Sequence, residues 1–185
     1  MGNLSDHFSG GGGGSSSNVL EILSAPCDGR TVTVSSGTYT VQNVTSSSNP
    51  GTTYIDVPGS VIDYLPPEGT TKVMYEFSIQ SGWDGTHAIT DYRLYIADAE
   101  VTAAKRGIGG YYDQSLSDLR WTFEIGDTAD AANGVVTSWD AAKELKWMAR
   151  NYGSSNDNKI NSQRYRDGAS SSYFTRPVIT ITALS

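Results

Sequence analysis

The chain has 185 residues, which is enough for one domain with a buried core, and its single cysteine, Cys27, cannot form an internal disulfide. A formal net charge of −7 argues against sequence-independent binding to nucleic acid, because such binding needs a concentrated basic surface. No apolar run approaches the roughly 18 residues of a membrane span, so membrane insertion is not expected.

The first 17 residues are predicted to stand apart from the folded domain, which we expect to cover residues 18–185. Five glycines and three serines fill positions 10–17, and this composition is typical of a flexible tether. Leu4 and Phe8 are four residues apart, so they would share one face if the peptide became helical on docking. We interpret the peptide before the tether as a docking peptide, consisting of Asn3, Leu4, Ser5, Asp6, His7 and Phe8.

The remainder of the chain shows the alternation of apolar and polar residues that predicts half-buried strands. Residues 31–44 read as two strands about a Ser-Ser-Gly turn, and residues 95–101 as a hairpin that turns at 97–99. The Pro66-Pro67 pair must lie outside a central strand. The residues expected to face the core are Val73, Tyr75, Phe77 and Ile79, then Tyr92, Leu94 and Ile96, then Trp121, Phe123 and Ile125, and finally Ile179 and Ile181.

Two stretches are harder to interpret. Residues 138–152 could begin a helix capped by Asp140, but the alternation from Leu145 favours a short turn or helical cap followed by a strand. The glycine-rich stretch 107–110 lacks the features of a phosphate-binding loop, and we expect it to be a flexible loop.

The pattern predicts an all-β chain of about nine or ten strands, arranged as an antiparallel β-sandwich. A jelly roll is the favoured architecture, with an immunoglobulin-like sandwich as the alternative. No strands alternate with long helices, so a parallel βαβ sheet is not expected.

No catalytic residue, metal site or cofactor site is predicted. His87 lies near Asp84 but without a nucleophile motif, and Asp127, Asp130 and Asn133 lack the spacing of an EF-hand loop, so both groups are expected to stabilise turns. Glu76 and Glu124 fall on the outward registers of their strands. Cys27 has no neighbour in the sequence that would activate it, so its thiol is expected to be inert.

Aromatic residues are more informative, because 11 tyrosines and four tryptophans are many for a chain of this size. Several of them lie outside the inward registers, where an exposed ring forgoes much of its hydrophobic gain unless a partner covers it. A second layer of the same fold could cover them. The other interpretations are a subunit interface or a platform for glycans, formed by Trp83, Tyr95, Tyr111 and Tyr112.

Five segments in order along the chain carry a resemblance to a known family: "NLSDHFSGGGGG" (3–14), "GSVIDYLPPEGTTKVMYEFSIQ" (59–80), "HAITDYRLYIADAEVT" (87–102), "LRWTFEIGDTADAANGVVTSWDAAKELKWMARNY" (119–152) and "YFTRPVITITA" (173–183). In these the chain resembles short virion structural proteins of marine tailed bacteriophages. The resemblance covers nearly the whole chain and implies a non-enzymatic, jelly-roll-like, trimeric component of the virion, assembled in the host cytoplasm.

The resemblance also implies that the N-terminal peptide binds other virion proteins while the β-domain projects outward. We expect a component of the tail fibre or tail tip that takes part in host attachment, with a host-surface glycan as a candidate partner. The alternatives are a capsid decoration protein of the knob or fibre type, a carbohydrate-binding module, and, with least support, a glycan-degrading enzyme that uses two carboxylates.

Overall fold

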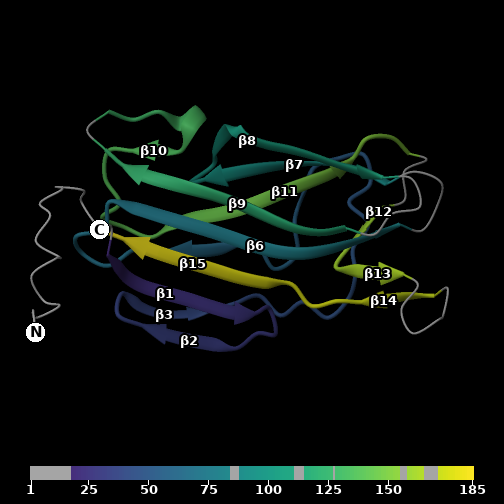
Figure 1. Cartoon of the computed structure of the whole chain (residues 1–185), viewed down its shortest axis with the longest axis horizontal. Coiled ribbons are helices and arrows are strands. Elements are labelled where there is room, and N and C mark those ends of the chain that lie inside the picture. The colour runs from purple at the N-terminus through teal and green to yellow at the C-terminus, as the bar shows by residue number, and fades with distance from the viewer. Residues whose placement is uncertain (1–17, 84–87, 111–114, 127, 155–157, 165–170) are drawn as a thin grey trace, which may run out of the picture.

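A computed structural model of the chain describes residues 18–83, 88–110, 115–126, 128–154, 158–164 and 171–185 (Figure 1). These residues form an all-β sandwich of two main sheets with two additional two-stranded sheets. A short 3-10 helix, η2 (Ala131–Asn133), interrupts the strands. In the described part of the chain, no helix is long and apolar enough to cross a bilayer.

The first sheet contains the two ends of the domain. Its strands lie in the order β1 (Val19–Pro26), β15 (Val178–Leu184), β6 (Lys72–Trp83), β9 (Ser115–Ile125) and β10 (Val135–Val136), and β12 (Asn158–Ile160) pairs with the end of β6. Neighbouring strands are antiparallel except β10, which runs parallel to β9.

The second sheet packs against the first. Its strands lie in the order β4 (Ile55–Asp56), β11 (Lys143–Asn151), β7 (Ala88–Ile96) and β8 (Ala99–Gly110), and β5 (Ile62–Tyr64) pairs with the start of β11. The two smaller sheets are β2 (Thr31–Val34) with β3 (Gly37–Thr40), and β13 (Ser162–Arg164) with β14 (Ser172–Phe174).

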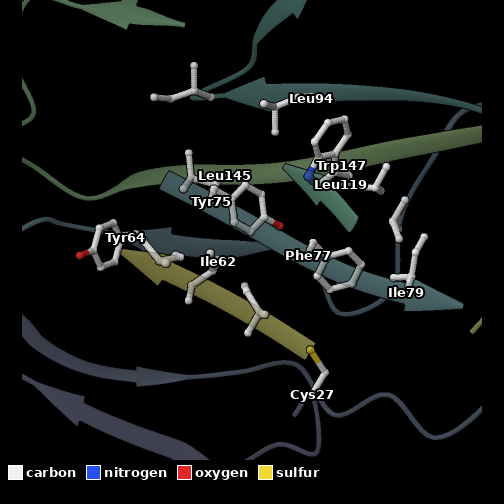
Figure 2. Close-up of a cluster of buried hydrophobic side chains, with 14 of the residues drawn as sticks. Cys27, Ile62, Tyr64, Tyr75, Phe77, Ile79, Leu94, Leu119, Leu145 and Trp147 are labelled. Carbon is white, nitrogen blue, oxygen red and sulfur yellow. The ribbon is translucent and has the colours of Figure 1, made fainter. Parts of the chain in front are cut away.

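The hydrophobic core fills the space between the two main sheets (Figure 2). Tyr75 and Phe77 of β6 point inward from the first sheet, and Leu94 and Trp147 do so from β7 and β11 of the second. The alternation that predicted these inward registers is confirmed, since each of these four side chains is fully buried. Burying a large apolar side chain contributes about 1.5–3 kcal/mol, so this layer stabilises the sandwich.

The hairpin between β7 and β8 was predicted correctly, and its turn shows why it is tight. Ala97 and Asp98 have φ values of 45° and 64°. Positive φ at both central residues is the geometry of a type I′ turn, whose twist matches that of the flanking strands. The predicted strand–turn–strand at 31–44 and the strand beginning near Leu145 are likewise present.

Two predictions about elements were wrong. The stretch 107–110 is not a loop but the end of β8, where Gly107 pairs with Asp91 and Gly109 with Ile89. Hydrogen bonds to the long strand β7 hold these glycines in the sheet despite their low strand propensity. The described residues contain fifteen strand segments rather than nine or ten, because several segments are only two or three residues long.

The two ends of the sandwich differ. The backbone N–H of Ser185 donates a 3.0 Å hydrogen bond to the carbonyl of Asn18, so the start of β1 and the end of β15 lie together at one end. Figure 1 shows the end of β6, the start of β7, the end of β8 and the start of β9 at the opposite end. β6 has 12 residues. At about 3.3 Å per residue, a strand of this length separates the two ends by roughly 40 Å.

Candidate functional site

The outward face of the second sheet carries a group of polar and aromatic side chains that we call the arginine–tyrosine cluster: Tyr54, Asp91, Arg93 and Arg150. Asp91 and Arg93 alternate on β7 with the buried Tyr92 and Leu94, so the strand's register places them outward. Arg150 of β11 pairs with Asp91 across the sheet. Tyr54 comes from the chain just before β4.

The phenol ring of Tyr54 lies at the centre of this cluster. The guanidinium carbon of Arg93 is 4.3 Å from the ring centre and that of Arg150 is 5.2 Å from it, which are cation–π distances. The Tyr54 hydroxyl donates a hydrogen bond to Asp91 Oδ2. Burial, reinforced by this hydrogen bond, raises the pKa of Tyr54, so the phenol remains a protonated donor.

The cluster continues along β7 and β8 to Tyr95 and Glu100. Arg93 Nη1 lies 3.4 Å and Lys105 Nζ 3.0 Å from the Glu100 carboxylate, and the Tyr95 hydroxyl donates to the same carboxylate at 3.4 Å. Burial acts to raise the pKa of Glu100, but the hydrogen bonds and charges of Lys105 and Arg93 together outweigh it and lower that pKa. Glu100 is therefore an ionised partner of cations and not a proton donor.

The arrangement is suited to binding an anionic group. Arg150 forms no ion pair with any residue that the structure describes, and its Nε is buried without a hydrogen-bond partner among them. A guanidinium can donate two parallel hydrogen bonds to a carboxylate or sulfate, and in Arg150 this role would fall to the terminal Nη1 and Nη2 groups, since Nε is buried. Gly107 of β8 pairs with Asp91 of β7. It leaves open space beside the cluster, since a Cβ built on Gly107 would meet nothing within 4 Å.

Open grooves also lie elsewhere on the described surface. One of about 650 Å³ is lined by residues 42–48 and 56–59, and one of about 410 Å³ by residues 65–70, Ile125 and residues 137–140. The second groove contains Glu68 and Asp140, both exposed. A general acid for glycoside hydrolysis is usually held in a desolvated pocket, whereas both of these carboxylates are exposed to solvent.

β1 carries a buried carboxylate, that of Glu21, which the sequence alone did not single out. Glu21 is only 6% exposed and accepts hydrogen bonds from the Ser35 hydroxyl, from the backbone N–H and hydroxyl of Ser36, and from the Tyr64 hydroxyl, at 2.6–2.9 Å. Desolvation acts to raise the pKa of Glu21, but these hydrogen bonds together lower it. The signal was present in the sequence, because Glu21 occupies the same strand register as the buried Leu23 and Ala25.

Most of the side chains proposed from sequence as site residues are not among those described. Asn3–Phe8, Asp84, His87, Tyr111, Tyr112 and Asp127 lie outside the described residues, and only the backbone of Trp83, the last residue of β6, is placed. Tyr95 is placed, half-buried beside Glu100.

The remaining predicted polar residues have structural partners. Asp130 caps η2 and accepts a 2.7 Å hydrogen bond from Asn133 Nδ2, as expected for a polar turn. Glu76 pairs with Arg120, and Glu124 with Lys72, on the outward face of the first sheet. Cys27 is fully buried, and burial raises its pKa to about 12. Among the described residues, no group of three or more His, Cys, Asp or Glu side chains is placed to hold a metal ion.

In comparisons with known proteins, no family model matches the chain and no curated protein matches it.

Proposed function

We propose that this chain is a non-enzymatic structural protein of a phage virion. The peptide Asn3–Phe8 binds another virion protein, and the β-sandwich projects outward as a component of the tail fibre or tail tip that takes part in host attachment. The observation that carries the proposal is the two-ended layout of the sandwich, in which the chain enters at one end and the long strands lead away from it to the opposite end.

This layout fits a projecting module. The tether joins the domain at Asn18, beside Ser185. β6 and β8 end, and β7 and β9 begin, at the far end of the sandwich from Asn18 and Ser185 (Figure 1). Loops carried on a rigid sheet scaffold are common positions for recognition, because they vary without disturbing the core.

We infer that the sandwich is a jelly roll, and the strand order supports this. The eight principal strands in chain order are β1, β4 with β5, β6, β7, β8, β9, β11 and β15. One sheet consists of β1, β15, β6 and β9, which are the first, eighth, third and sixth of these strands. The other consists of β4 with β5, β11, β7 and β8, which are the second, seventh, fourth and fifth. Two four-stranded sheets joined in this way form the double Greek key found in many capsid and lectin domains, an analogy of fold that fits the virion role.

The chemistry of the described residues favours a binding role. The buried carboxylate Glu21 is occupied by four hydrogen bonds, and Glu100 by cations. The Cys27 thiol is buried with a raised pKa, so it is a poor nucleophile. These groups stabilise the fold and are not available for proton transfer or nucleophilic attack.

Deleting residues 1–14 tests the anchoring role. The truncated protein should remain folded and soluble but should no longer co-purify with phage particles. Replacing Leu4 and Phe8 together with alanine should have the same effect, whereas replacing Ser15 and Ser16 with alanine, as a matched change in the tether, should not. Particles that retain the truncated protein would overturn the proposal. A low-resolution map of the labelled particle distinguishes a tail position from the alternative, a capsid knob or fibre.

A second candidate function is the binding of acidic glycans on the outer face of the second sheet. It is favoured by the guanidinium of Arg150, which lies beside the Tyr54 ring and forms no ion pair with the residues that the structure describes. This function is compatible with a virion role, since an attachment protein can itself bind a host-surface glycan.

A further inference from the structure

β1 exposes apolar side chains and buries its one charged side chain. Val19, Leu20 and Ile22 are 57%, 38% and 55% exposed, whereas Glu21 is 6% exposed. A strand at the edge of a soluble sandwich ordinarily shows the reverse pattern, with polar residues outward. Glu21 is held inward by Ser35, Ser36 and Tyr64, so the network fixes the register that presents Leu20 and Ile22 to the outside.

β1 is also the end strand of its sheet. Of the described strands, β15 is the one that forms a ladder with β1, since β2 and β3 pair with each other. The β2–β3 turn contacts β1 from the inner side, through the hydrogen bonds of Ser35 and Ser36 to Glu21. In the described structure, therefore, no strand continues the first sheet beyond β1.

The other edges of the two main sheets are protected against strand pairing. β10 has two residues, and β4 and β5 have two and three. β8 is 12 residues long but carries the exposed charges of Lys105 and Arg106. Short edge strands and edge charges are the usual means of preventing association between sheets. β1 has eight residues and exposes apolar side chains, but the β2–β3 hairpin lies next to it, so the surface left open is the outward face of β1 and not its edge.

The surface around Leu20 and Ile22 suits a second copy of the same chain. The side chains in the outward register of β1 and β15 are uncharged: Leu20, Ile22, Ser24, Val178, Thr180 and the largely buried Thr182. The chain as a whole carries a formal charge of −7, so two copies repel each other where charged faces meet. The uncharged surface of β1 and β15 lets two copies approach each other. The ion pairs on β6 and β9, such as Glu76 with Arg120, form the polar rim of this surface.

We propose that β1 is the centre of an interface between copies of this chain, which we call the β1 interface. It buries Val19, Leu20, Ile22 and the neighbouring Val178, which is 38% exposed, against the second copy. The inference concerns the domain alone and does not depend on a virion role. If the domain is anchored by its N-terminal peptide, the interface joins several weak peptide contacts into one firm attachment, because it raises their effective concentration.

Light scattering coupled to size-exclusion chromatography tests the β1 interface on the full chain. The wild-type protein should elute with the mass of two or more 19.8 kDa chains, and Ile22→Lys should elute as a monomer at the same concentration. The matched control is Ile89→Lys, which places the same charge at an isoleucine that is 40% exposed on the second sheet, and it should keep the wild-type mass. A monomeric wild-type protein would overturn the proposal, as would an Ile22→Lys variant that keeps the wild-type mass.

Two further variants keep the test valid if Ile22→Lys fails to fold. Ile22→Thr retains a β-branched residue suited to a strand and should shift the equilibrium towards monomer in the same direction. Ile22→Cys should form a disulfide between copies under mild oxidation, whereas Ile89→Cys should not. Absence of both effects would overturn the proposal.

The outcome also separates the β1 interface from the anchoring role. A monomeric wild-type protein whose Ile22→Lys variant no longer joins particles would assign this surface to another protein and overturn self-association. The deletion of residues 1–14 would still report on the N-terminal peptide by itself.

Discussion

The hydroxyl of Tyr64 donates a 2.9 Å hydrogen bond to Glu21 Oε1, and both side chains are buried between β1 and β5. Ser35 and Ser36, in the turn between β2 and β3, donate to the same carboxylate. One buried charge therefore joins the first strand, the β2–β3 hairpin and β5. Because a buried carboxylate is costly without partners, each of these donors carries more weight than a surface hydrogen bond.

We expect Tyr64→Phe to reduce the free energy of unfolding by about 1.5–3 kcal/mol, because it removes a hydrogen bond to a buried charge. Tyr75→Phe is the matched control. Its hydroxyl donates to the neutral carbonyl of Ser60, away from Glu21, so the loss should be nearer to about 1 kcal/mol. Urea unfolding followed by circular dichroism measures both values. Equal losses would show that the charge of Glu21 adds nothing to the Tyr64 hydrogen bond.

Glu21 should also make stability depend on pH. Its pKa in the folded protein lies below the ordinary value of 4.5, so its contribution is fully present above that value and is lost as the pH falls through the lower folded pKa. The free energy of unfolding should therefore fall from about pH 5 downward. Glu21→Gln should be less stable at neutral pH but should show a smaller acid loss. Parallel pH profiles for the two proteins would contradict this assignment.

The turn between β7 and β8 offers a stabilising change. Ala97 has a φ of 45°, a conformation that costs an L-residue with a side chain about 1 kcal/mol and costs glycine little. Ala97→Gly should thus raise the free energy of unfolding. Ala99→Gly, two residues later at the start of β8, should lower it, because glycine weakens a strand. Thermal unfolding of the two variants gives the sign directly, and two shifts in the same direction would argue against the type I′ turn.

We expect the arginine–tyrosine cluster to bind glycans that carry carboxylate or sulfate groups. Arg150→Ala should lower the affinity for these glycans by at least about tenfold, because one charge-assisted hydrogen bond supplies about 1.5–3 kcal/mol. Arg120→Ala, on the first sheet, removes a charge at a site remote from Tyr54 and should leave binding unchanged. A glycan array followed by calorimetry measures the effect. Binding that survives Arg150→Ala would place the glycan site elsewhere.

The sequence predicted the long strands well, for a physical reason. β6 and β7 each present one face to the core, so burial imposes a strict alternation, and Tyr75, Phe77 and Leu94 lie where that alternation predicts. Short segments such as β4 and β10 do not repeat often enough to show a period. The glycines at 107–110 were misassigned because their strand conformation comes from pairing with β7, not from local preference.

The candidate site was harder to predict, because it depends on sheet order. Tyr54, Arg93 and Arg150 come from three separate segments, and they meet only because β11 lies between β4 and β7. Alternation along β7 correctly places Leu94 inward and Tyr95 on the opposite face, but it contains no information on which strand lies alongside. The inverted pattern of β1 was visible in the sequence, and its meaning became clear once Ser35, Ser36 and Tyr64 were found around Glu21.

The position of β1 also determines how the domain would bear mechanical load. The strand begins beside Ser185, and its antiparallel ladder with β15 extends from Val19 to Pro26 towards the far end. Tension applied between the N-terminal tether and the far end of the sandwich pulls β1 along its own axis, so the hydrogen bonds of the ladder are strained together in shear. Tension applied between the two chain ends would instead peel β1 from β15 one pair at a time, and the same domain would yield at a much lower force.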